Sequence, residues 1–76
     1  MQRTRVNSTI LLSVGYDSDV NILELEFASK DVYKYYNVPG YIYLGLMLAA
    51  SYGTYFNQHI KDVYDYNKVN AGFAEV

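Results

Sequence analysis

The chain of 76 residues has no cysteine and no tryptophan, and it has only one proline and one histidine. Without cysteine there can be no disulfide, no thiolate nucleophile and no zinc site built on sulfur ligands. One histidine does not supply an ordinary transition-metal cluster, so we expect neither a metal site nor a cofactor. At this length we expect a single domain, close to the size at which one core is marginal and oligomerisation adds stability.

Charge is scarce as well, with a formal net charge of -2. This balance argues against a strongly basic nucleic-acid surface, because phosphate neutralisation supplies much of such binding. Between Lys34 and Lys61 the sequence contains no Asp, Glu, Lys or Arg. A lone small domain normally covers one side of each helix with charge. We therefore expect this stretch to meet a second surface, through self-association or a buried ligand.

Long hydrophobic runs are missing too. The longest, residues 41–50, is too short to cross a bilayer and is interrupted by Gly45. Arg3 and Arg5 are not followed by an unbroken apolar segment of signal-peptide length, because Ser13 interrupts it. These features predict a cytoplasmic protein without a membrane partner.

Three segments alternate apolar and polar residues as half-buried strands do, namely residues 10–16, 20–27 and 32–36. They predict an antiparallel three-stranded meander. The turn at residues 17–20 is expected to give these facing pairs: Val14 with Leu23, Leu12 with Leu25, and Ile10 with Phe27. A loop at residues 28–30 is expected to give these: Leu25 with Tyr33, Leu23 with Tyr35, and Glu24 with Lys34 on the outer face.

The pattern changes at Pro39, which cannot continue a paired strand but suits the first turn of a helix. We expect a first helix over residues 39–50 that buries four side chains, Ile42, Leu46, Ala49 and Ala50. Ser51 is a candidate N-cap for a second helix over residues 52–60. The expected fold is therefore α+β, a three-stranded antiparallel meander followed by two helices packed on one face.

Several segments in this order resemble the KTSC family, a small domain named after the C-terminus of some lysyl-tRNA synthetases and also found as stand-alone proteins. The resemblance covers residues 7–69, nearly the whole chain. Its two most specific parts are the motifs Tyr33-Lys34-Tyr35 and Tyr55-Phe56-Asn57-Gln58-His59-Ile60. It implies a single domain over residues 1–76, with a core over about 7–69 and a flexible tail at 70–76.

The synthetase context of the family implies RNA binding. In family members the helical half usually carries several charges, often basic, whereas this chain has Thr54 and Gln58 in those places. This departure favours a protein subunit or a small ligand over a polyanion as the partner of the helical half.

The candidate ligand-binding residues come mainly from the charge-free stretch. Asn57 and His59 can donate to or accept from a phosphate or a base edge, and Tyr52 and Tyr55 offer stacking surfaces. Lys61 and Arg5 are the flanking cations of this predicted site. Tyr33 and Tyr35 are expected in the core rather than in the site. His59 has no partner base, nucleophile or metal set at a recognisable spacing, so we expect no enzyme activity.

Three hypotheses remain from the sequence. In the first, the protein is a homo-oligomer, assembled through its helical half, that binds or sequesters a small nucleotide-type ligand in an aromatic, His and Asn pocket. The second is RNA binding, which the charge balance disfavours. The third is a structural or adaptor role in which the charge-free helices hold subunits or another protein together.

Overall fold

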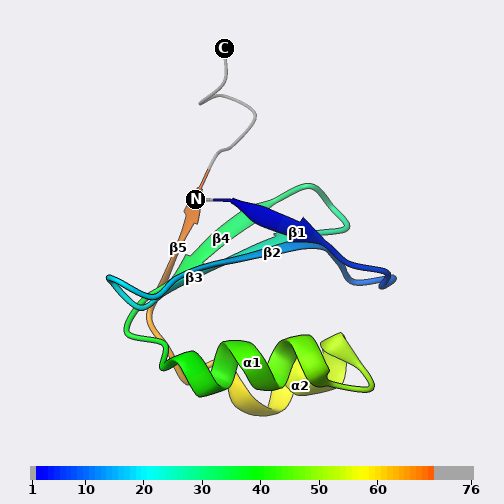
Figure 1. The fold of residues 1–76 in the computed structure, drawn as a ribbon. Coiled ribbons are helices and arrows are strands. Elements are labelled where there is room, and N and C mark those ends of the chain that lie inside the picture. Colours follow the sequence, from blue (N-terminus) through cyan, green and yellow to red (C-terminus); the bar gives the residue numbers. More distant parts are fainter. Residues whose placement is uncertain (1, 70–76) are drawn as a thin grey trace.

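The computed structural model describes residues 2–69 and shows an α+β fold in two layers (Figure 1). The elements, in chain order, are β1 (Arg3–Arg5), β2 (Leu11–Asp17), β3 (Ile22–Phe27), β4 (Val32–Tyr35), α1 (Gly40–Leu48), α2 (Tyr52–His59) and β5 (Tyr66–Val69). Both helices lie on one face of the sheet, as expected (Figure 1). The tail expected at residues 70–76 lies outside the described residues.

The sheet has five strands in the order β1-β2-β3-β4-β5, all antiparallel, so the prediction of a three-stranded meander followed only by helices was wrong. The chain adds β1 before the meander, and after α2 it returns to pair β5 with β4. All three residues of β1 are exposed, as are three of the four in β5. Neither edge strand therefore shows the alternation of apolar residues by which the central strands were recognised.

The hairpin of β3 and β4 has the predicted register. Leu25 faces Tyr33, Leu23 faces Tyr35, and Glu24 faces Lys34. The Lys34 ammonium lies 3.9 Å from the Glu24 carboxylate, which also receives Arg3 from β1 at 3.3 Å. The Glu24 carboxylate on the outer face of β3 therefore pairs with Lys34 of the adjacent β4 and, across β2, with Arg3 of β1.

The register of the first hairpin differs from the prediction. Val14 faces Leu25 instead of Leu23. The turn lies at residues 18–21, one position later than predicted, and this shifts the pairing by two residues. A shift of two leaves each side chain on its predicted face of the sheet. A β-bulge between Leu11 and Ser13 then reverses the alternation. As a result Leu11 is buried in the core, while Ile10 is exposed and Leu12 only half-buried.

Helix α1 begins directly after Pro39 and ends at Leu48. Ile42 and Leu46 are buried, as predicted. The prediction that Ala49 and Ala50 continue this buried stripe was wrong, because the helix stops before them and Ala50 is exposed. Neighbouring residues of an irregular segment no longer share the face that helical spacing would give them.

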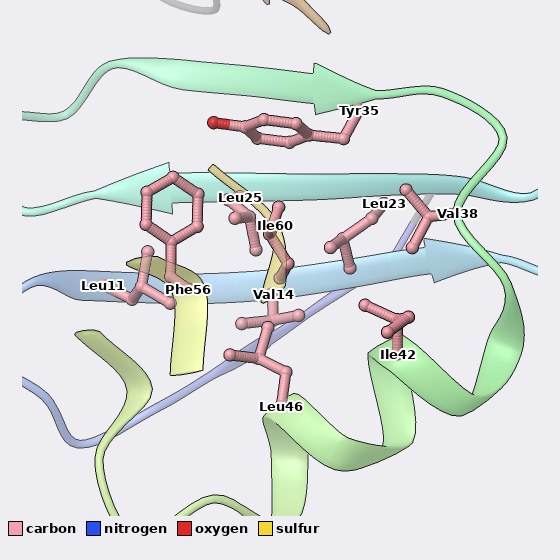
Figure 2. Packing of buried hydrophobic residues seen from close by; sticks show 10 residues of the cluster. All are labelled: Leu11, Val14, Leu23, Leu25, Tyr35, Val38, Ile42, Leu46, Phe56 and Ile60. Carbon is pink, nitrogen blue, oxygen red and sulfur yellow. The ribbon is translucent and has the colours of Figure 1, made fainter. Parts of the chain in front are cut away.

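Helix α2 begins at the predicted N-cap, where the Ser51 hydroxyl accepts a hydrogen bond from the Thr54 backbone N–H at 3.2 Å. Phe56 and Ile60 point from this segment toward the sheet (Figure 2). They complete a core between the layers that comprises Leu11, Val14, Leu23, Leu25, Tyr35, Val38, Ile42, Leu46, Phe56 and Ile60. Tyr35 is a core residue, as predicted, whereas Tyr33 is half-buried at the edge of the core.

Candidate functional site: an aromatic hollow beside β5

An open hollow of about 360 Å³ lies between the inner face of the sheet and the segment that follows α2. We call it the aromatic hollow, because five rings line it: Phe27, Tyr33, Tyr35, Phe56 and Tyr66. Strands β3 and β4 and helix α2 supply four of the rings. The fifth comes from β5, so the return of the chain to the sheet is what completes the wall.

The rings of the hollow contact one another in a continuous chain. The Tyr66 centroid lies 5.5 Å from that of Tyr33 and 5.4 Å from that of Tyr35. Phe27 meets Tyr33 edge-on at 5.5 Å. Phe56 meets Tyr35 edge-on at 5.9 Å, and these two rings are drawn in Figure 2. Such ring pairs are mutually attractive beyond the area they bury. The wall is therefore held in place before any ligand arrives.

A hydroxyl group and charged groups, both acidic and basic, surround the rings. Ser29 and Asp31 come from the loop between β3 and β4, and Lys61 and Asp62 come from the segment after α2. The Lys68 ammonium lies 3.4 Å from the Asp31 carboxylate. The hollow thus offers carboxylate and hydroxyl oxygens as acceptors beside an exposed cation, Lys61.

The Tyr35 hydroxyl is held in its neutral form. Burial above all, and then the neighbouring Tyr33, Tyr66 and Asp62, raise the pKa of Tyr35 to about 12. Both causes act by making a negative charge on the phenol oxygen less favourable. The Tyr35 hydroxyl therefore keeps its proton, and can donate a hydrogen bond, further into the alkaline range than an exposed tyrosine does.

The predicted aromatic and imidazole residues lie together on α2. The Tyr55 and His59 rings have centroids 4.4 Å apart, and the Tyr55 hydroxyl donates to the Ile42 carbonyl of α1 at 3.0 Å. Tyr52 and Tyr55 are half-buried and pack against the core, so their rings hold α2 in place. Asn57 and His59 are exposed on the same helix.

The two predicted cations lie far apart in the sheet order. Lys61 lines the aromatic hollow beside β4 and β5, whereas Arg5 belongs to β1 at the opposite edge. No hydrogen bond or ion pair among residues 2–69 joins Arg5 to α2. Of the predicted site residues, Lys61 is the one that lines the hollow.

Tyr66 and the acidic residues of the hollow, Asp31 and Asp62, were not among the predicted site residues. The sequence signal for Tyr66 is weak: Tyr64 and Tyr66 alternate with polar residues as in a short strand, but β5 begins only at Tyr66. In the part of the chain that the structure describes, no three potential metal ligands come together, and no helix is long and apolar enough to span a bilayer.

Comparison with known proteins places this fold in a family. The model of the KTSC domain matches residues 7–70. An uncharacterized protein of Stutzerimonas stutzeri is 43% identical over 61 residues, which cover 80% of this chain and 86% of the relative. A protein of Tsukamurella paurometabola is 36% identical over 56 residues, which cover 74% of this chain and 84% of the relative.

A crystal structure of a KTSC domain protein from Yersinia pestis is similar to this chain, with a TM-score of 0.88 and 37% identity. The alignment covers 90% of this chain and 96% of the Yersinia chain. The protein described here belongs to the KTSC domain family, as its two motifs indicated.

Proposed function

We propose that the protein is a non-catalytic binding module that holds a small nucleotide-type ligand with its base in the aromatic hollow. The observation that carries this proposal is the convergence of five rings on one open hollow. A volume of about 360 Å³ lies within the usual range for small-molecule sites, which is about 300–1,000 Å³. Stacking a base on an aromatic ring contributes about 1–3 kcal/mol.

The polar groups favour a base that carries an exocyclic amino group. Carboxylates accept hydrogen bonds from such groups, and Asp31 and Asp62 lie at the margin of the rings. Lys61 is in reach of the hollow as a counter-charge for a phosphate. Acceptors and a cation beside a stacking surface match the parts of a mononucleotide.

An extended RNA strand is a weaker candidate. Three of the six basic side chains, Arg3, Lys34 and Lys68, lie within 4 Å of an acidic side chain. Their charges are thus partly neutralised within the chain, and the net charge remains -2. RNA binding draws most of its affinity from phosphate contacts, which these pairs diminish.

The test is to add each of the four ribonucleoside monophosphates to the protein and to measure binding by calorimetry and by the change in melting temperature. We expect AMP, GMP or CMP to raise the melting temperature more than UMP, with a weak dependence on salt. Tyr66→Ala removes a ring of the hollow that is 54% exposed, and the stacking energy lost should weaken binding by about 5- to 150-fold. Tyr41→Ala is the matched control, because Tyr41 is an exposed tyrosine outside the hollow.

A second variant separates the two places where a ligand could sit. Asn57→Ala combined with His59→Ala should leave binding unchanged, because neither residue lines the aromatic hollow. If this pair abolishes binding and Tyr66→Ala does not, the site lies on α2. If no monophosphate binds, while an RNA oligonucleotide binds with an affinity that falls steeply with salt, the protein is an RNA-binding domain instead.

A further inference from the structure

One face of α1 is apolar and exposed. It carries Tyr41, Leu44 and Leu48, whose exposed fractions are 72%, 58% and 85%. We call these three residues the α1 ridge. They are spaced by three and then four positions, so they share one side of the helix. Ile42 and Leu46 point from the opposite side into the core (Figure 2).

The remaining sides of α1 are occupied within the chain. Tyr43 stacks on Tyr16 of β2, with ring centroids 4.9 Å apart and planes 7° from parallel. Gly45 faces the ring of Tyr55 on α2. Among residues 2–69 the α1 ridge is therefore the side of this helix that lacks a packing partner.

We propose that the α1 ridge is covered by a second copy of this chain, with the two α1 helices packed across a two-fold axis. In a two-fold interface the same surface of both copies meets, so a charged residue beside the axis would face the identical charge of the other copy and be repelled by it. The helical layer satisfies this condition, since no charged residue occurs between Lys34 and Lys61. Two copies with a net charge of -2 can therefore meet there without opposing like charges.

The spacing of the α1 ridge also suits a helix partner. Three and then four positions is the spacing of the apolar seam between two packed helices. Leu44 is the middle residue of the ridge and would lie closest to the axis, facing the α1 ridge of the other copy. The α1 ridge and the aromatic hollow share no residue, so the two proposals rest on separate surfaces.

The α1 ridge is small for a protein interface. Three large side chains offer on the order of 300–400 Å² of apolar surface per copy, against about 800 Å² per partner in a standard interface. We therefore expect a dimer that forms with rising concentration rather than an obligate one.

Sedimentation of the full chain between about 10 μM and about 1 mM, the range of weak complexes, tests this interface. The wild-type mass should rise from monomer to dimer. Leu44→Glu places two carboxylates beside the axis and should weaken the dimer at least about tenfold. Val20→Glu is the matched control, because Val20 is 55% exposed, close to the 58% of Leu44, but lies in the turn between β2 and β3.

Circular dichroism should show the same folded spectrum for both variants, since each replaces an exposed side chain. Loss of the dimer in Leu44→Glu, with the dimer retained in Val20→Glu, supports the proposed interface. A wild-type chain that is monomeric throughout this range overturns the proposal. So does a dimer that survives Leu44→Glu, or one that Val20→Glu weakens equally.

Discussion

Replacing Gly45 with alanine tests how closely α1 and α2 pack. A Cβ atom at this position would lie 2.8 Å from the Tyr55 Cζ atom and 3.0 Å from its Cε2 atom, with the hydroxyl oxygen nearer still. Real Cβ atoms essentially never approach another heavy atom within 3.0 Å. Glycine at position 45 is what allows the Tyr55 ring to lie across α1.

The cost of Gly45→Ala follows from two ways of relieving this clash. If the Tyr55 ring stays, overpacking costs about 1–3 kcal/mol. If the ring swings out, the chain loses the hydrogen bond to the Ile42 carbonyl, about 0.5–1.5 kcal/mol, and the ring pair with His59, about 0.5–1.5 kcal/mol. Alanine regains up to about 1 kcal/mol of helix propensity. Taking the middle of each range, about 2 kcal/mol, and subtracting this gain leaves an expected net loss of about 1–2 kcal/mol by either route.

Thermal and urea unfolding, followed by circular dichroism, measure this change. For a domain of this size, each kcal/mol shifts the melting temperature by about 4–8 °C, so Gly45→Ala should melt roughly 4–16 °C lower. Gly40→Ala is the matched control on the same helix. Its Cβ would meet nothing closer than the Tyr16 hydroxyl at 3.9 Å, an ordinary contact. Gly40→Ala should therefore be neutral or slightly stabilising.

The reasoning fails if Gly45→Ala melts at or above the wild-type temperature while its folded spectrum is unchanged. Helix propensity would then outweigh the contact, and the Tyr55 ring would not pack against α1 as described. A drop of the same size in Gly40→Ala would also refute it, because the effect would then belong to any alanine in α1 and not to the Tyr55 contact.

Two further predictions concern stability. Ser51→Ala removes the hydroxyl that caps α2 and should cost about 1 kcal/mol in urea unfolding, whereas Ser51→Asn should retain most of it; equal losses would exclude capping as the cause. Tyr35 has a pKa of about 12 in the folded chain, against 10.0 for a solvent-exposed tyrosine, so its contribution to stability is complete below pH 10 and is lost as the pH rises through 12. Tyr35→Phe should therefore lose less stability than the wild type between pH 9 and pH 11.5, by about 2 kcal/mol, and parallel curves would contradict this account.

Much of the fold was predictable because local pattern and tertiary environment agree. Leu23 and Leu25 alternate with Glu24, and this alternation gave both the inner face of β3 and the register of its hairpin with β4. Ser51 marked the start of α2, because a hydroxyl that accepts from the third following N–H is a local interaction. One family motif, residues 33–35, lies on β4, and the other, residues 55–60, lies on α2 and its C-cap residue.

The remaining features depend on contacts between distant residues. The bulge that buries Leu11 in place of Ile10 and Leu12 is decided by how β2 must bend over the core. Strands β1 and β5 are held by backbone hydrogen bonds to their neighbours, and these bonds leave almost no mark on the side-chain pattern.

The candidate site shows the same division. The sequence indicated that tyrosines and a flanking Lys61 would matter, because a ring with a polar tip suits a binding surface. It grouped Lys61 with Tyr55 and Arg5, since sequence distance and motif membership were the available guides. In the structure Lys61 instead lines the same hollow as Tyr33, Tyr35 and Tyr66.

By itself the sequence determined the fold class, the central hairpin, the two helices and a charge-free helical layer, because each depends on neighbouring residues or on composition. The tertiary structure alone decided that β5 returns beside β4 and brings Tyr66 to within 5.5 Å of Tyr33. It also decided which face of the uncharged α1 is left exposed. Both outcomes depend on packing between residues that are far apart in the sequence, and a short stretch of sequence does not contain that information.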